Sequence, residues 1–272
     1  MTTSDQWQAD VGKAWAAEAA RTDRSFAALT PGLLDAIAAR PGKAVLDIGC
    51  GAGELSLAVA RARPQAQVLG VDISAELVAV ARERAAGLAN ARFLVADAAA
   101  ADPGFQPDLL VSRQGVMFFD DPVAAFARLC SHAAPGAALV FSCFRAETEN
   151  PWAWDLARMV AWPDQPQTGG TAPGPFAFAD PARVERLLTE AGWRDVELAP
   201  ADYSYLVGEG DDAVADALSF LTRIGPAARA LRDRDEADRA RIVARMEAWL
   251  SGNCRHGRIV FPAAAWIVTA RQ

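Results

Sequence analysis

The sequence contains few lysines, and long apolar runs are missing from it. Lys13 and Lys43 are the only lysines among 272 residues, and the formal net charge is −7. Because phosphate binding needs clustered basic side chains, we exclude a general nucleic-acid binder. No stretch approaches the roughly 18 apolar residues that a membrane span needs, and the N-terminal "MTTSDQWQAD" is polar rather than signal-like. We therefore expect a cytoplasmic protein without a membrane span.

Histidine and cysteine are also scarce, which bears on metal binding. No CxxC pair occurs, so neither a zinc site nor a disulfide framework is predicted. His132 lies in a helical stretch and His256 in "GNCRHGR"; we expect a surface or capping role for the first and a turn for the second rather than catalysis. The cysteines are Cys50, Cys130, Cys143 and Cys254.

Apolar runs do alternate with amphipathic stretches, beginning near residue 43. Five such strand-to-helix steps are visible by residue 145, and two later runs, 193–207 and 257–272, extend the series. Continuous apolar runs separated by helices are typical of parallel strands covered on both faces. The sequence therefore predicts an α/β fold: a Rossmann-like, doubly wound, mostly parallel sheet of seven strands with helical cap insertions.

The stretch "VLDIGCGAGE", residues 45–54, places three glycines in five positions just after an apolar run. Backbone without side chains at the first strand-to-helix turn lets N–H groups approach a ligand closely. The spacing is GxGxG rather than the dinucleotide GxGxxG, and the preceding Asp47 would repel a pyrophosphate but suits a cationic group. Asp72 at the end of the second run is placed to accept two ribose hydroxyls, and Asp97 at the end of the third could bind an adenine amino group.

With these residues, the chain resembles the class I S-adenosylmethionine-dependent methyltransferases. The later stretches resemble a bacterial subgroup related to the ubiquinone and menaquinone biosynthesis methyltransferases. The resemblance is carried by "VLDIGCGAGE", "GVDIS", "FLVADAA" and "DLLVSRQGVMFFDDP", and later by "PGPFAFADPARVERLLTEAGWRDVEL" and "AAWIVTAR". It therefore covers most of the chain.

The resemblance implies S-adenosyl-L-methionine as the cofactor and assigns residues to its parts. Asp47 would lie near the ammonium group and Asp72 would hold the ribose, while Ile73 would stack on the adenine. Gln114 stands where this subgroup leads us to expect an aromatic residue. The methionine part would contact Gly49, Gly51 and Ala52, the adenine would lie between Asp97 and Ala98, and backbone groups of Ser112 and Arg113 would close the methionine side.

The same resemblance implies one methyltransferase domain over residues 1–272. Its parts would be a helical lid over 1–41, a cofactor-binding core over 42–145, a cap insertion over 146–179 and a C-terminal part over 180–272. Within the last we expect two helices at about 211–250. For Trp7 and Trp15 near the N-terminus, a lid role and ordinary helix packing both remain open.

Methyl transfer mainly requires alignment of donor and acceptor and exclusion of water, so no catalytic base is assigned. Arg145 at the end of the fifth run and Phe118 after the fourth are candidate substrate contacts. Trp152 and Trp154 could line an apolar acceptor pocket or pack the cap on the sheet. Tyr203 and Tyr205 share one face of a strand, where core packing is the expected role.

The leading hypothesis is a methyltransferase acting on an oxygen or carbon of a small aromatic or isoprenoid-like molecule. A nicotinamide-dependent oxidoreductase is an alternative, since Asp72 would also suit NAD. A cofactor-binding protein without transfer activity is a third. The oligomeric state and the acceptor are not predicted.

Overall fold

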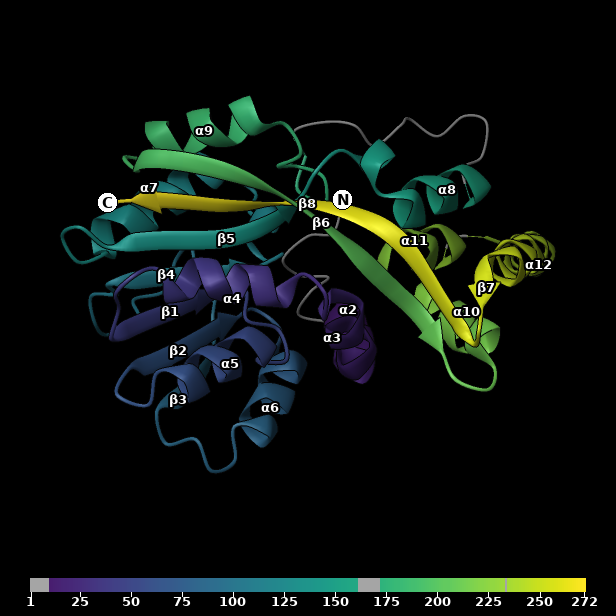
Figure 1. Cartoon of the computed structure of the whole chain (residues 1–272), viewed down its shortest axis with the longest axis horizontal. Helices are drawn as coiled ribbons and strands as arrows, with labels where there is room; N and C mark the ends of the chain where they lie inside the picture. Colours follow the sequence, from purple (N-terminus) through teal and green to yellow (C-terminus); the bar gives the residue numbers. More distant parts are fainter. Residues whose placement is uncertain (1–9, 161–171, 233) are drawn as a thin grey trace.

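The centre of the computed structural model, which describes residues 10–160, 172–232 and 234–272, is an eight-stranded sheet (Figure 1). Its order is β3-β2-β1-β4-β5-β8-β6, with β7 paired to β8. The first five strands are parallel, whereas β8 runs antiparallel to both β5 and β6. The strands are β1 Ala44–Ile48, β2 Gln67–Asp72, β3 Ala91–Val95, β4 Leu109–Arg113, β5 Ala138–Phe144, β6 Arg194–Glu209, β7 Cys254–Arg255 and β8 Arg258–Arg271. The predicted α/β sheet is confirmed, and two-residue β7 adds to the seven strands expected.

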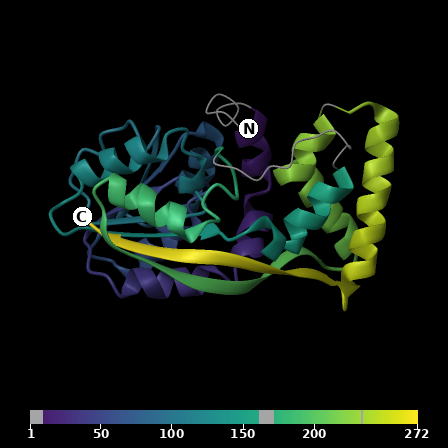
Figure 2. The ribbon, with the colours of Figure 1, turned by 90° about the horizontal axis from the view of Figure 1, so that it is seen from above.

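Helices cover both faces of this sheet (Figure 2). None of the helices in the described ranges has the length and apolar character that crossing a membrane requires. The helices are α2 Asp10–Ala17, α3 Ala19–Phe26, α4 Thr30–Ala38, α5 Glu54–Ala62, α6 Ala75–Arg84, α7 Pro122–His132, α8 Pro151–Val160, α9 Pro181–Glu190, α10 Ala213–Arg223, α11 Gly225–Arg232 and α12 Glu236–Asn253, with short 3₁₀ turns at Val116–Phe118 and Glu147–Glu149.

Alternate residues of the parallel strands point to opposite faces of the sheet and pack in two separate hydrophobic clusters. Val45 of β1 packs in one cluster with Leu33 of α4 and Val59 of α5. The next residue, Leu46, belongs to the opposite cluster, together with Phe126 of α7. Because both faces of each strand are buried, the strands read as continuous apolar runs in the sequence.

The last two long strands continue beyond the sheet as a two-stranded ribbon. β5 pairs only with Ala265–Arg271 of β8, so Pro262 lies where β8 has β6 but not β5 beside it, a position that tolerates a residue without a backbone N–H. α8, α10 and α12 pack on this ribbon, and α11 packs on α8 and α10; the four helices form the cap seen at the right of Figure 1. Here the expected two helices are three, because the backbone becomes extended at Ile224, between α10 and α11, and Gly225 then begins α11 with φ +78°.

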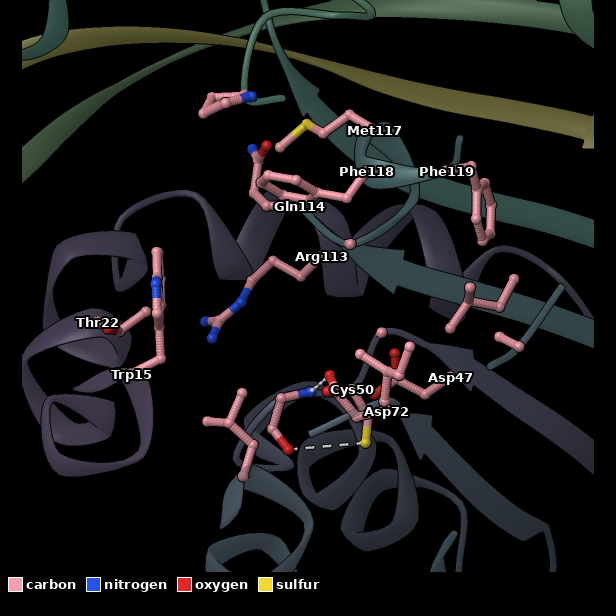
Figure 3. A pocket seen from close by; sticks show the side chains of 18 of the residues that line it. Trp15, Thr22, Asp47, Cys50, Asp72, Arg113, Gln114, Met117, Phe118 and Phe119 are labelled. Carbon is pink, nitrogen blue, oxygen red and sulfur yellow. Dashed lines mark hydrogen bonds between the residues drawn. The ribbon is translucent and has the colours of Figure 1, made fainter. Parts of the chain in front are cut away.

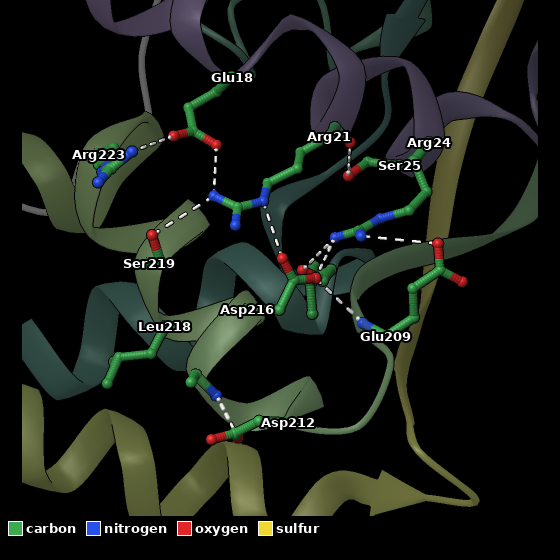
Figure 4. A network of polar contacts seen from close by, with 12 residues as sticks. Glu18, Arg21, Arg24, Ser25, Glu209, Asp212, Asp216, Leu218, Ser219 and Arg223 are labelled. Carbon is green, nitrogen blue, oxygen red and sulfur yellow. Dashed lines mark hydrogen bonds and ion pairs between the residues drawn. The ribbon is translucent and has the colours of Figure 1, made fainter.

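A polar network joins α3, near the N-terminus, to α10 of the cap (Figure 4). Arg21 Nη1 lies 2.8 Å from Glu18 Oε2, and its Nε lies 2.8 Å from Asp216 Oδ1. Arg24 Nη2 reaches the other oxygen of Asp216 at 2.8 Å, and Arg223 reaches Glu18 at 2.8 Å. The Glu18 side chain is only 2% exposed, so its charge depends on these partners.

We expect Arg21→Met to lower the free energy of unfolding by about 1–3 kcal/mol, because it removes one partner from a buried carboxylate and one from Asp216. Urea denaturation would measure this loss. Arg255→Met is the matched control: this exposed arginine donates to the neighbouring Cys254 carbonyl, and we expect a change within about 0.5 kcal/mol. Equal losses in both variants would contradict a stabilising role for the network.

Candidate functional site

A cavity of about 520 Å³ opens at the carboxyl ends of the parallel strands (Figure 3). Its floor is the turn after β1 together with the ends of β2 and β4, and α2 and α3 form one side. Figure 3 shows Asp47, Cys50 and Asp72 on one wall and Gln114, Met117 and Phe118 opposite them. Residues of β5, α8 and α10 line the far end, so segments far apart in the sequence enclose a single space.

The three glycines of the first turn have different physical roles. Gly51, with φ +53°, has nothing within 4 Å of where a Cβ would stand, so its backbone faces open space. Gly49, with φ +66°, lies against Gly115, whose Cα would be 3.0 Å from an added Cβ. At Gly53 an added Cβ would meet Ala81 at 2.9 Å, so this glycine permits α5 and α6 to pack. Gly51 therefore offers bare backbone to a ligand.

Asp72 fixes the glycine turn from the end of β2. Gly51 N donates to its Oδ2 at 2.8 Å, and Ser74 N donates to its Oδ1 at 2.9 Å. Burial raises the pKa of this carboxyl above its ordinary value, and the backbone donors oppose that shift. Since each carboxylate oxygen can accept a further hydrogen bond, Asp72 can hold two more donors in the cavity.

Asp47 lies deeper, at 1% exposure, while still lining the cavity. Ser56 Oγ donates to its Oδ2 at 2.5 Å, but Oδ1 is buried without a partner. Burial raises the pKa of Asp47 to about 7, against the lowering effects of Ser56 and Arg113. Because Asp47 Oδ1 is buried and has no hydrogen-bond partner, a cationic group beside it would stabilise the ionised carboxylate.

The residues predicted around the adenine also reach this space. Ile73, Asp97 and Ala98 line the cavity, and so does Ala52. Asp97 is exposed, with Ala99 N donating to its Oδ1 at 2.8 Å. The structure thus brings the three strand-end carboxylates to one hollow.

Ser112 and Arg113 differ from one another in position. Ser112 is fully buried: its Oγ donates to Ile48 O at 2.6 Å and accepts from Gly115 N at 3.2 Å, so its side chain supports the turn from within the core. Arg113 lines the cavity and forms ion pairs with Asp23 at 2.9 Å and with Glu54 at 2.6 Å. The side chain of Arg113 therefore connects the end of β4 to α3 and α5.

Two of the four candidate substrate contacts line the cavity. Phe118 lies on the wall shown in Figure 3, and Trp152 stacks on Tyr205 with ring centroids 4.5 Å apart. Arg145 and Trp154 are not among the described lining residues. Arg145 pairs instead with Asp202 at 2.8 Å and with Glu149, and stacks over a tryptophan ring. Neighbouring carboxylates hold Arg145 away from the described lining residues, and its contact with substrate stays a prediction.

The remaining sequence candidates are placed as follows. Trp15 lines the cavity and packs with Ala52 and Leu77, while Trp7 lies outside the described residues. His132, at the end of α7, is bonded to Arg128 O, and His256 adopts φ +51° in a turn. Neither histidine is among the described lining residues.

Sequence reasoning missed several aromatic side chains at the far end of the cavity. The sequence predicts core packing for Tyr205 and no site role for Phe26, yet both line the cavity, as do Phe144 and Phe220. Each lies in an amphipathic or apolar run whose pattern predicts burial. Burial against the core and burial around a cavity leave the same signal, so these residues could not be separated from ordinary core.

Comparisons with known proteins agree on one class. Residues 39–192, more than half of the chain, match the model of a family described as a methyltransferase domain. The chain is 40% identical over 167 residues to a trans-aconitate 2-methyltransferase of Deinococcus radiodurans, covering 58% of this chain and 60% of that one. It is 36% identical over 164 residues to a ubiquinone biosynthesis O-methyltransferase of Xanthomonas campestris pv. campestris, covering 58% and 65%. The matches thus span less than two thirds of these relatives.

Solved structures share the fold at low sequence identity. A candidate methyltransferase of Bacillus halodurans C-125 superposes with a TM-score of 0.56 at 13% identity, covering 89% of this chain and 97% of that one. Phosphoethanolamine N-methyltransferase 2 of Haemonchus contortus, solved in complex with S-adenosyl-L-methionine, gives 0.51 at 17% identity, covering 90% and 52%. These similarities concern the fold alone.

Proposed function

This chain belongs to the methyltransferase-domain family, and we propose that it is an S-adenosylmethionine-dependent methyltransferase that methylates a neutral, largely apolar small molecule on oxygen or carbon. Aromatic and isoprenoid-like compounds are the acceptor classes that fit. The enzyme class and cofactor follow the leading hypothesis from the sequence, and the nicotinamide alternative is set aside.

The residues of the first turn fit the cofactor that the family uses. Bound S-adenosylmethionine supplies an electrophilic methyl group on a positively charged sulfur. The bare backbone at Gly51 leaves room for its amino-acid part, and the unpartnered Asp47 Oδ1 would face its ammonium group. Asp72 would accept the ribose hydroxyls, while Ile73 and Asp97 would border the adenine.

The acceptor class rests on the lining of the far end of the cavity. Described residues from β5, α8, β6 and α10 supply mainly aromatic and aliphatic side chains there: Phe144, Trp152, Tyr205, Phe220, Leu221 and Ile224. An apolar wall of this kind favours an acceptor that loses little hydration on entry.

Anionic acceptors are disfavoured by the state of the basic side chains. Arg113 and Arg128 are the two cations among the described lining residues. Arg113 is paired with Asp23 and Glu54, and Arg128 Nη2 donates to Ala100 O at 2.8 Å. Arg128 keeps its charge, but it is held at the loop that follows Asp97, away from the aromatic and aliphatic side chains of the apolar end. A polyanion such as the acceptor named for the Deinococcus relative, placed against those apolar side chains, would therefore lack an unpaired cation among the described residues that line that end, which is costly.

The chain's part in the reaction would be to align donor and acceptor and to exclude water. Burial raises the pKa of Tyr205 well above its ordinary range, so its phenol stays protonated and cannot serve as the base near neutral pH. An acceptor that is already acidic, or one that reacts through carbon, needs no strong base and therefore suits this site best.

The test is methyl transfer from labelled S-adenosylmethionine to a panel of acceptors. We expect turnover with neutral phenols, quinols and prenylated phenols, and at least about tenfold lower kcat/KM with trans-aconitate, whose charges lack partners. Saturable binding of S-adenosylhomocysteine would be measured separately by thermal shift. Preferential methylation of trans-aconitate would contradict the proposed acceptor class while leaving the enzyme class intact.

A further inference from the structure

Gln114, the residue directly after β4, has an unusual backbone conformation. It adopts φ +59°, a region that L residues other than glycine rarely occupy. Its N–H donates to Ser142 O at 3.1 Å, which anchors it to β5. The next residue, Gly115, is wedged so closely that an added Cβ would lie 2.6 Å from Ile48 O. The surrounding chain therefore holds Gln114 in a strained conformation, a condition that concentrates at functional sites.

The side-chain amide of Gln114 has no hydrogen-bond partner. Both Nε2 and Oε1 are buried and unpaired, although the residue lines the cavity. Figure 3 shows the amide beside Met117 and Phe118, side chains that offer it little polar compensation. A buried amide normally finds partners for its donors and acceptors, so an unpaired one in a ligand cavity points to the ligand as the missing partner.

Gln114 lies on the cavity wall that carries Met117 and Phe118 (Figure 3). The preceding residue, Arg113, turns instead toward Asp23 of α3 and Glu54 of α5, with which it is paired. The polar groups proposed for the cofactor lie on the opposite wall, around Asp47 and Asp72 (Figure 3). A molecule that lies between these two walls can reach the Gln114 amide.

We infer that Gln114 is an acceptor-binding residue that pairs with a hydrogen-bond donor and a hydrogen-bond acceptor on neighbouring ring atoms of the methyl acceptor. This inference rests on the proposed function and narrows its substrate class. An amide presents one acceptor oxygen and one donor nitrogen side by side, so two adjacent hydroxyls, or a hydroxyl beside a carbonyl, match it. A carboxylate would satisfy the donor but would leave Oε1 facing negative charge.

The experiment uses the protein saturated with S-adenosylhomocysteine and two uncharged probes, naphthalene-2,3-diol and 2-naphthol, with binding measured by calorimetry. We expect the wild type to bind the diol at least about tenfold more tightly than the naphthol. Gln114→Leu should abolish that preference while changing the affinity for S-adenosylhomocysteine by less than about twofold.

Ser142→Ala is the matched control. Its hydroxyl is also buried and unpartnered, but Ser142 is not among the described lining residues, so the preference for the diol should persist. The inference is overturned if the wild type binds both probes equally or binds neither, or if Gln114→Leu keeps the preference. Failure to bind S-adenosylhomocysteine would instead count against the cofactor site of the proposed function.

Discussion

Asp72→Ala is expected to weaken binding of S-adenosylhomocysteine by about 100-fold or more. Two effects add: loss of charge-assisted hydrogen bonds to the ribose, each worth about 1.5–3 kcal/mol, and loss of the anchor that holds Gly51 N at 2.8 Å. About 2.8 kcal/mol corresponds to a factor of 100 in affinity. Isothermal titration calorimetry would measure the change, and circular dichroism would confirm that the variant folds.

Two further variants control this prediction. Asp72→Asn keeps an oxygen for one of the two backbone donors, so its loss of affinity should lie between those of the wild type and the alanine variant. Asp97→Ala removes an exposed carboxylate bound to Ala99 N and should cost less than about tenfold. Wild-type affinity in Asp72→Ala would mean that the ribose lies elsewhere.

The parts of the site that the sequence predicted are those set by local chain order. Asp47, Asp72 and Asp97 each end or adjoin a strand of a parallel sheet, and parallel strands present their carboxyl ends at one edge. The βα rhythm alone therefore places all three near one cavity. Ser74 and Asp180 each accept a backbone N–H at the start of a helix, another role that depends on local chain order.

The parts that escaped prediction depend on pairings between distant segments. Arg145 directly follows β5, but its partner Asp202 lies 57 residues further along, brought there by the register of β6 on β8. For Ser112 the prediction concerns its backbone groups, whereas the burial of its side chain is a property of the packed structure. Gln114 was recognisable as unusual by type, whereas its strained φ and unpaired amide are properties of the packed structure.

Asp47→Asn is expected to have opposite effects on stability and on cofactor binding. In the cofactor-free protein, burial raises the pKa of Asp47 to about 7 from an ordinary value of 3.8. The folded state therefore binds more protons than the unfolded state between these values, and stability falls as pH rises through this window. Asparagine does not titrate. Relative to the wild type, the variant should gain about 3 kcal/mol in free energy of unfolding between pH 5 and pH 8.

Binding should change in the other direction. The ammonium of the cofactor needs the ionised carboxylate, so wild-type affinity for S-adenosylhomocysteine should fall by up to about tenfold per pH unit below pH 7 and level off above it. Asp47→Asn should bind more weakly at pH 8 and show little pH dependence between pH 6 and pH 8.

Ser56→Ala provides a control for this pH dependence that keeps the carboxyl group. Ser56 lowers the pKa of Asp47 through its hydrogen bond, so its removal should move the wild-type midpoint to higher pH without abolishing it. Calorimetric titrations at pH 6, 7 and 8, paired with thermal unfolding of the cofactor-free proteins, would measure both effects. A wild-type affinity that stays constant across this range would show that Asp47 is not the group that meets the ammonium.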